Sequence, residues 1–302
     1  MLKIVNPATE AVIAEIPDDA GAVGVKMERA RAAQPAWAAS GEARFRWLPV
    51  FRKLLIERKE KLSLTLTSEM GKPITQSRNE IEGMLGRIDY FLEHVPRVLR
   101  EEVVHHDAAG HLKERITHEP LGVIANISAW NYPYYVGSNV FIPALMAGNA
   151  VLYKSSEHAT LTGLAIRDLI LDAGVPESIF IAVVGDGRVG AELVAQPVQG
   201  LYFTGSYGAG KKDAEATAGR MIKVQMELGG KDPIYVADDP GVAAAVADGA
   251  FYNAGQSCCA VERIYVHRAI AAPLLEAFVA AVKGFAIGDP VDPATYLGPL
   301  AR

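Results

Sequence analysis

Three short segments of the sequence contain residues whose types and positions could carry out nucleophilic catalysis. Asn131 follows an apolar run in Ala-Trp-Asn-Tyr-Pro, Glu227 opens Glu-Leu-Gly-Gly-Lys, and Cys258 lies in Gly-Gln-Ser-Cys-Cys-Ala. A side-chain amide at a strand end can stabilise a developing oxyanion, and a carboxylate there can act as a general base. A cysteine in a turn of small residues, close to a helix N-terminus, can be a reactive thiolate. Together the three predict covalent catalysis by a cysteine.

Each of these residues also has a purely structural interpretation. An asparagine before an aromatic-proline pair is often only part of a turn. Glu227 could form a salt bridge with Lys231, and a free cysteine is most often buried and inert. Singly, none of the three decides between catalysis and structure.

Two glycine-rich segments could bind the phosphates of a dinucleotide. Residues 185–190 match the pattern G-x-G-x-x-G after an apolar run, but that fingerprint also needs an acidic residue about 20 positions later to hold a ribose. The corresponding segment, Phe203-Thr204-Gly205-Ser206-Tyr207, contains none. The alternative is a glycine-rich turn that packs near the cofactor. The second segment, residues 205–210, ends a predicted strand and opens a helix, where backbone amides favour a pyrophosphate.

Lys154 and Glu157 follow the end of another predicted strand. There they could form hydrogen bonds with a ribose diol. The alternative is an exposed Lys–Glu pair on a solvated surface.

The elements that must position these residues alternate between strand and helix after Pro120. Such a rhythm predicts an α/β fold with a parallel sheet and helices on both faces, and ligands of such sheets bind beyond the carboxyl ends of the strands. The predicted strands are 121–127, 150–153, 179–184, 201–203, 222–226, 234–236 and 263–266, with a helix at 161–172 and another between the last two strands. Before Pro120 we predict helical structure over 19–72, a helix over 81–97, and a projecting β-hairpin over 101–120 with its turn near 107–110.

The bulk properties exclude several classes of protein. A chain of 302 residues is long enough for two domains. A net charge of −5 gives no sign of the excess of basic residues that proteins use to bind nucleic acid or an anionic membrane. The first residues lack a signal-peptide pattern, and no apolar stretch is long enough for a membrane helix. The only cysteines, Cys258 and Cys259, are adjacent, so we predict no disulfide framework and a cytoplasmic protein. We predict no metal site.

The complete series of motifs resembles the aldehyde dehydrogenase superfamily. The segments occur in that family's order, with similar spacing, over nearly the whole chain. The matching segments are 6–9, 69–73, 118–122, 130–133, 154–157, 203–206 with Gly210, 227–231 and 255–258.

The resemblance implies a role for each candidate residue. Cys258 is the implied nucleophile, Asn131 and the backbone amide of Cys258 the oxyanion hole, and Glu227 the activator of the water that hydrolyses a thioester. NAD is the implied cofactor, preferred over NADP because Glu157 would repel a 2′-phosphate. The implied cofactor-binding residues are Trp130, Lys154, Glu157, Gly205, Ser206 and Gly210.

The resemblance also implies a division into domains. Residues 1–101 and 121–229 would form a Rossmann-like NAD-binding domain, residues 102–120 an oligomerisation hairpin, and residues 230–302 the first part of a catalytic domain. Family chains continue past the Leu-Gly-Pro-Leu segment that begins at Leu297, with a Glu-x-Phe-Gly-Pro segment that holds the nicotinamide ribose. That segment is absent here. We therefore expect a C-terminally incomplete catalytic domain, little activity from this chain alone, and a homo-oligomer if the protein is full length.

Three functions stay open. The first is oxidation of a small-molecule aldehyde to a carboxylic acid. The second is a CoA-acylating reaction, in which CoA replaces water; acylating relatives commonly lack a carboxylate at the position of Glu227, so its presence favours hydrolysis. The third is an inactive fragment that at most binds nucleotide. The identity of the aldehyde is not readable from the sequence.

Overall fold

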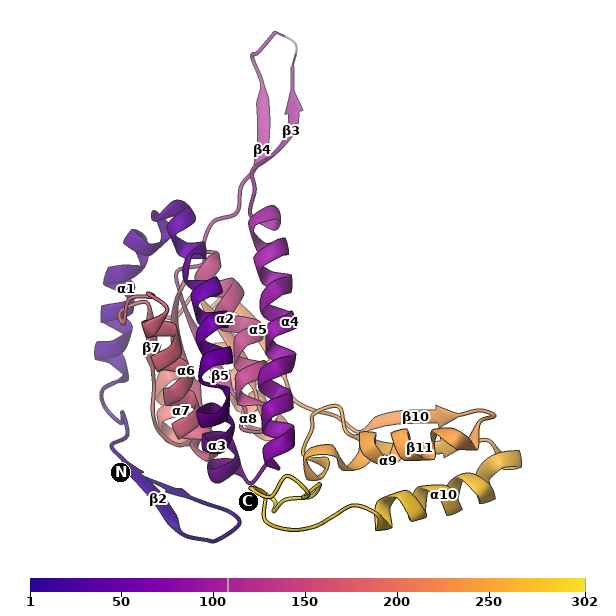
Figure 1. Cartoon of the computed structure of the whole chain (residues 1–302). Coiled ribbons are helices and arrows are strands. Elements are labelled where there is room, and N and C mark those ends of the chain that lie inside the picture. The colour runs from indigo at the N-terminus through magenta and orange to yellow at the C-terminus, as the bar shows by residue number, and fades with distance from the viewer. Residues whose placement is uncertain (108, 302) are drawn as a thin grey trace.

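The centre of the molecule is a five-stranded parallel sheet in the order β7-β6-β5-β8-β9 (Figure 1). The structure is a computed structural model that describes residues 1–107 and 109–301. The strands are β5 (Val123–Ser128), β6 (Ala150–Ser155), β7 (Phe180–Ala182), β8 (Gly200–Thr204) and β9 (Lys223–Glu227). All five were predicted, and no boundary differs by more than two residues. The α/β fold is confirmed.

Helices cover both faces of this sheet. On one face, α5 (Pro133–Met146) packs against α6 (Thr160–Asp172). On the other face, α7 (Gly187–Val194) contacts both α1 (Val23–Ala38) and α8 (Tyr207–Thr217). Every residue of β6 is buried, which is typical of a strand that is covered on both faces. The strands run parallel, so their carboxyl ends meet at one edge.

The N-terminal helices agree with the prediction in part. The helical structure predicted over 19–72 is confirmed, and it consists of α1, a 3₁₀ turn (Gly41–Phe45), α2 (Trp47–Glu57) and α3 (Lys59–Met70). Helix α4 (Ile74–Val98) begins well before the predicted start at residue 81. The buried side of its first two turns includes the polar residues Gln76, Ser77 and Glu80, so apolar periodicity could not reveal it.

Two hairpins extend from the body. Strands β3 (Glu102–His106) and β4 (Lys113–Ile116) are antiparallel and fully exposed, and they project as an arm (Figure 1). The predicted hairpin is therefore confirmed; residue 108 of its turn lies outside the described residues. A second hairpin, β1 (Leu2–Val5) with β2 (Val12–Ile16), was not predicted.

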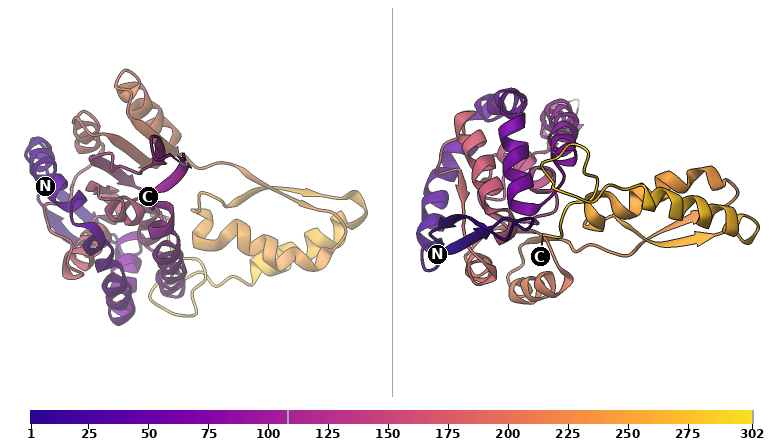
Figure 2. Two further views of the ribbon diagram at one scale, coloured as in Figure 1. Left: turned by 90° about the horizontal axis from the view of Figure 1, so that it is seen from above. Right: turned by 60° about the horizontal axis from the view of Figure 1, so that its bottom comes forward.

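The last part of the chain forms a separate, thinner unit. Strands β10 (Asp232–Val236) and β11 (Val261–Val266) pair in parallel, with α9 (Ala243–Phe251) between them in sequence, as predicted. Helix α10 (Ala271–Lys283) packs against α9. This unit extends sideways from the five-stranded sheet (Figure 2). The proposed division into domains stays a prediction.

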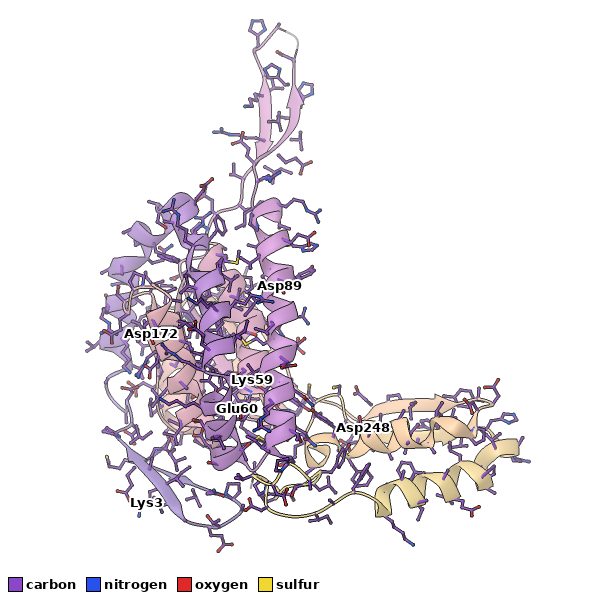
Figure 3. All side chains as sticks on the ribbon, viewed as in Figure 1. Lys3, Lys59, Glu60, Asp89, Asp172 and Asp248 are labelled. Carbon is purple, nitrogen blue, oxygen red and sulfur yellow. The ribbon has the colours of Figure 1, made fainter. Side chains whose placement is uncertain are left out.

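Ion pairs on the surface join neighbouring helices (Figure 3). Lys59 at the start of α3 pairs with Glu82 of α4, and Arg52 of α2 binds Asp89 of α4 at 2.7 Å. Exposed pairs of this kind contribute about 0–1 kcal/mol each. A search of the described helices finds none with the length and apolar character needed to span a bilayer.

Candidate active site

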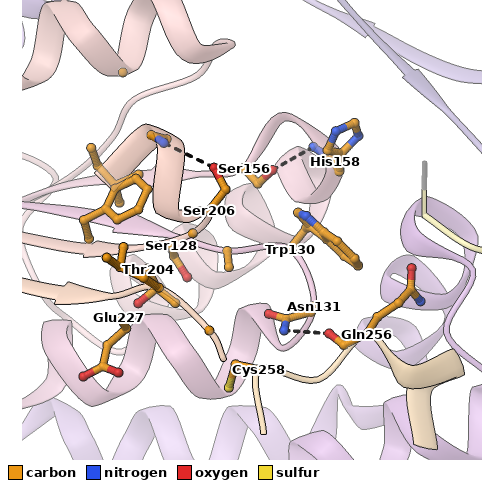
Figure 4. A pocket seen from close by; sticks show the side chains of 18 of the residues that line it. Ser128, Trp130, Asn131, Ser156, His158, Thr204, Ser206, Glu227, Gln256 and Cys258 are labelled. Atoms are coloured by element: carbon orange, nitrogen blue, oxygen red, sulfur yellow. Dashed lines mark hydrogen bonds between the residues drawn. The ribbon is translucent and has the colours of Figure 1, made fainter. Parts of the chain in front are cut away.

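The carboxyl ends of the sheet strands and the loop before β11 enclose one cavity of about 730 Å³ (Figure 4). Eight of the nine residues predicted for the site line it, and they come from segments far apart in the sequence. The eight are Trp130, Asn131, Lys154, Glu157, Gly205, Ser206, Glu227 and Cys258. Volumes of about 300–1,000 Å³ are usual for ligand pockets, so the cavity is large enough for an extended cofactor.

Asn131 is held between β5 and α5 by its own hydrogen bonds. Its Nδ2 donates to the carbonyl of Gln256 at 2.8 Å, and its Oδ1 accepts from the amide of Tyr132 at 3.1 Å. These partners fix which side of the amide is nitrogen. A carboxamide nitrogen carries two N–H groups, so one remains to donate into the cavity beside the cysteine loop.

Cys258 lies in a loop with unusual backbone. Asn253, Ala254 and Gly255 all have φ between 55° and 73°, and left-handed conformations of non-glycine residues are costly and cluster at functional sites. The loop leads into β11 and not into a helix, so the predicted helix N-terminus beside Cys258 is wrong. The cysteine is exposed, so the alternative of a buried, inert thiol is wrong as well.

In the described part of the chain, no helix begins at the Cys258 loop to lower the pKa of its thiol. Partial burial of the sulfur, and then the neighbouring Cys259, raise the pKa of the Cys258 thiol above its ordinary value. In the described structure the thiol is therefore mostly protonated near neutral pH. A base or a nearby positive charge is needed to generate the thiolate.

Glu227 ends β9 with its side chain exposed at the cavity. Its Oε1 accepts a hydrogen bond from Gln225 at 3.3 Å. Lys231 pairs with Glu262, so the predicted alternative of a Glu227–Lys231 salt bridge is wrong. The carboxylate therefore has no ion pair with that lysine.

The start of α8 has the features of an anion site. Ser206 caps the helix, with its Oγ accepting from the amide of Ala209 at 3.3 Å. Gly210 does not line the cavity; a Cβ there would collide with Leu228 and Phe203. The glycine therefore lets the helix pack closely against the strand ends, and the amides of its first turn face the cavity.

Lys154 is buried, with 3% of its surface exposed, so the alternative of a solvated Lys–Glu pair is wrong for the lysine. Burial lowers its pKa, while the carboxylates of Glu157, Asp186 and Asp213 act in the opposite direction. Burial also raises the pKa of Asp213, which lines the same cavity. Sequence reasoning missed Asp213, which has no motif around it.

The G-x-G-x-x-G segment lies beside the cavity too. Gly187 and Gly190 line it, and Asp186 caps α7 by accepting from the amide of Arg188 at 2.8 Å. A side chain at Gly185, with φ of 153°, would collide with Val189. The geometry agrees with a glycine-rich turn packed near the cofactor. Among the residues that the structure describes, no cluster of histidine, cysteine or carboxylate could hold a metal ion.

Comparison with known proteins gives the family. The model of the aldehyde dehydrogenase family matches residues 1–302. The chain belongs to this family. It is 36% identical to betaine aldehyde dehydrogenase 1 of Rhizobium meliloti (strain 1021), over 99% of this chain and 62% of that protein. The chain thus spans about three fifths of the length of this curated relative.

Solved structures of the family share the fold. A 3,6-anhydro-L-galactose dehydrogenase in complex with NAP is 34% identical, with a TM-score of 0.91 over 99% of this chain and 64% of that one. PnpE in complex with nicotinamide adenine dinucleotide is 33% identical, with a TM-score of 0.93 over 99% of this chain and 63% of that one. A nicotinamide dinucleotide cofactor follows for the family, without a choice between the two forms.

Proposed function

We propose that the protein to which this chain belongs oxidises an aldehyde to a carboxylic acid through a covalent intermediate on Cys258. The observation that carries the proposal is the shared cavity: Asn131, Glu227 and Cys258 all line it together with the strand ends. Family membership supplies the reaction class. An inactive protein is disfavoured because the three groups that the chemistry needs are all present at one place.

The first half of the reaction uses the cysteine loop. The Cys258 thiol loses its proton to water, and the thiolate Sγ then adds to the carbonyl carbon. The C=O π bond breaks, and negative charge develops on the carbonyl oxygen. The remaining N–H of the Asn131 amide donates to that oxygen, as does the backbone amide of Cys258. Pre-positioned donors of this kind contribute on the order of 10²- to 10³-fold to the rate.

The cavity fits a nicotinamide dinucleotide. The start of α8 at Ser206 suits the pyrophosphate, and Lys154 and Glu157 at the end of β6 suit the adenosine ribose. A bound NAD would supply the hydride acceptor for oxidation of the Cys258 adduct to a thioester.

The second half of the reaction uses Glu227. Its carboxylate takes a proton from the water that attacks the thioester carbon, and the acid leaves as the Cys258 sulfur is released. A CoA-acylating reaction would have no use for this base. The exposed carboxylate at the cavity therefore favours hydrolysis.

We propose NAD as the preferred cofactor, because Glu157 at the cavity would repel a 2′-phosphate. Glu157 is half-buried and accepts a hydrogen bond from the Ser156 hydroxyl, and like-charge contacts can cost several kcal/mol, so the expected preference in kcat/KM is about ten- to a hundredfold. Glu157→Gln should reduce it, while Glu215→Gln on the exposed side of α8 should not. A preference for NADP in the unaltered protein would contradict the assignment.

The substrate is proposed only as an aldehyde. Betaine aldehyde is a natural first member of a test panel because relatives carry that name. The exposed β3–β4 arm is proposed to contact another subunit in a homo-oligomer, and the cytoplasmic location stays a prediction.

The deciding experiment compares the two adjacent cysteines. Cys258→Ser should lower aldehyde-dependent NADH formation by at least about 10³-fold, because an essential nucleophile is lost. Cys259→Ser should stay within about twofold of the unaltered protein, since Cys259 is not part of the cavity lining. The reverse result would refute Cys258 as the nucleophile.

A further inference from the structure

A fully buried ion pair lies directly behind Asn131. Lys72 follows the end of α3, and Glu80 lies in α4; their Nζ and Oε2 atoms are 2.5 Å apart, and both side chains are 0% exposed. The Nζ also donates to the backbone carbonyl of Asn131 at 2.6 Å and lies 3.8 Å from the centroid of the Tyr132 ring. All three partners of the ammonium group are thus fixed by the fold.

Stability alone gives a weak reason for this pair. Removing two charges from water costs several kcal/mol per ion, and apolar replacements of buried pairs are often neutral or stabilising. Burial lowers the pKa of Lys72, and the charge of Glu80 opposes that shift. The charged state of Lys72 therefore depends on Glu80, and the pair acts as one unit.

The pair fixes the segment that carries the Asn131 amide at two places. Lys72 holds the carbonyl of Asn131, and the Oε1 of Glu80 accepts from the amide of Tyr134 at 2.8 Å in the first turn of α5. The peptide between these points is short. Its direction, and with it the direction of the Asn131 side chain, is set by the ion pair.

The same carbonyl also connects to the nucleophile loop. The Nδ2 of Asn253 donates to it at 3.3 Å, and the side-chain Nδ2 of Asn131 donates to the carbonyl of Gln256 at 2.8 Å. Asn253 is completely buried and has a left-handed backbone. Lys72 therefore contacts an atom at which the segment of Asn131 and the loop of Cys258 meet.

We propose that Lys72, paired with Glu80, is a positioning residue that aligns the Asn131 amide with Cys258. Lys72 does not touch substrate; it acts through the carbonyl of Asn131. The proposal rests on the function proposed above, because it assigns the oxyanion donor whose position the pair controls. Displacements of about 1 Å in such a donor can cost on the order of 10²-fold in rate.

The test replaces both charges together. Lys72→Met with Glu80→Gln removes the ion pair, while a glutamine Oε1 can still accept from the amide of Tyr134. We expect kcat to fall about 10- to 100-fold with little change in KM for aldehyde or NAD, and the thermal midpoint to stay within a few degrees. Wild-type kcat in this variant would overturn the proposal.

The matched control uses the same residue types, with the glutamate on the same helix α4. Lys59→Met with Glu82→Gln removes the exposed α3–α4 pair, and kcat should not change. If the control loses as much activity as the buried pair, the effect is not specific to the carbonyl of Asn131 and the proposal fails.

A double-mutant cycle with Asn131→Ala separates positioning from general support. If Lys72 acts through the Asn131 amide, removing the ion pair in the Asn131→Ala background should cause no further loss of kcat. Multiplying losses would show independent roles and overturn the proposal. Should the double substitution prevent folding, Glu80→Gln alone keeps the volume and the contact with Tyr134, and the same cycle applies with a smaller loss.

A crystal structure of the variant distinguishes this inference from the function on which it rests. If the unaltered protein oxidises no aldehyde, the proposed function fails, but the geometry can still be tested. Without the ion pair, the 2.8 Å contact between Asn131 Nδ2 and the carbonyl of Gln256 should lengthen beyond hydrogen-bonding distance. An unmoved Asn131 would refute the positioning role.

Discussion

The five-stranded sheet and the unit formed by residues 232–301 contribute different groups to the cavity and are stabilised differently. The sheet carries a large continuous core between two layers of helices. The second unit has only four buried apolar residues in its own cluster: Val236, Ala243, Val246 and Leu274. Its two strands pair Tyr235 with Tyr265, and these residues have exposed fractions of 63% and 54%.

The second unit is held against the sheet by polar contacts. Gln76 of α4 accepts from the amide of Asn253 at 2.9 Å and donates to the carbonyl of Tyr296 at 2.9 Å. The amide of Ile74 donates to the carbonyl of Pro290 at 2.8 Å. The residues of the cavity at the ends of β5, β6 and β8 thus belong to the large core region, whereas the loop of Cys258 is joined to that region by a few directed hydrogen bonds.

The largest expected effect is a loss of turnover when Glu227, the proposed base at the end of β9, is replaced. Glu227→Gln removes the base supplied by the sheet, so one equivalent of NADH should form rapidly before turnover slows by about 10²- to 10⁴-fold, the usual contribution of a general base. Stopped-flow absorbance at 340 nm measures both phases. Glu262→Gln, an exposed carboxylate paired with Lys231, serves as the control; full turnover in the Glu227 variant would mean that another group activates the water.

Shortening a buried side chain should lower the free energy of unfolding more in the large core than in the small cluster. Phe141 is fully buried between Phe51, Tyr153 and Phe180, so Phe141→Ala should lower the free energy of unfolding by about 3–5 kcal/mol. Leu274→Ala in the small cluster should cost about 2 kcal/mol, because a thin unit can collapse around the missing atoms. Urea denaturation followed by circular dichroism measures both, and equal losses would contradict the expected difference between the two clusters.

The smallest expected effect is a shift in the pH dependence of alkylation at the Cys258 thiol. Burial and Cys259 raise the pKa of Cys258, so the thiolate, and with it the rate of alkylation by iodoacetamide, should increase about tenfold per pH unit below that pKa. Cys259→Ser removes the second cause, so the profile should move toward lower pH. Mass spectrometry of the labelled peptide gives the rate at Cys258, and a rate already constant at neutral pH would contradict the raised pKa.

Much of the sheet region could be predicted from local patterns. The apolar runs of β5 to β9 end in turns with distinctive residues, and each predicted boundary lies within two residues of the observed one. The motifs around Asn131, Glu227 and Cys258 could be placed at strand ends or in a turn for the same reason. Periodicity and turn chemistry are properties of neighbouring residues, so a sequence displays them directly.

Features that depend on distant segments could not be predicted in this way. The first turns of α4 bury polar residues, so their helical period is hidden, and the pairing of Lys72 with Glu80 gives no pattern at all. The turn at Cys258 predicted a helix start, yet the chain continues into β11 because that strand finds β10 as its partner.

The sequence by itself therefore determined the order of strands and helices, the projecting hairpin and the types of residue available for catalysis. Only the tertiary structure decided that Asn131 and Cys258 face one cavity, and that a buried lysine holds the carbonyl between them. The physical reason is that a buried charge or hydrogen bond is stable only when its partner arrives from another segment. Such partners here lie as far apart as Gln76 and Asn253, which are 177 positions apart in the chain.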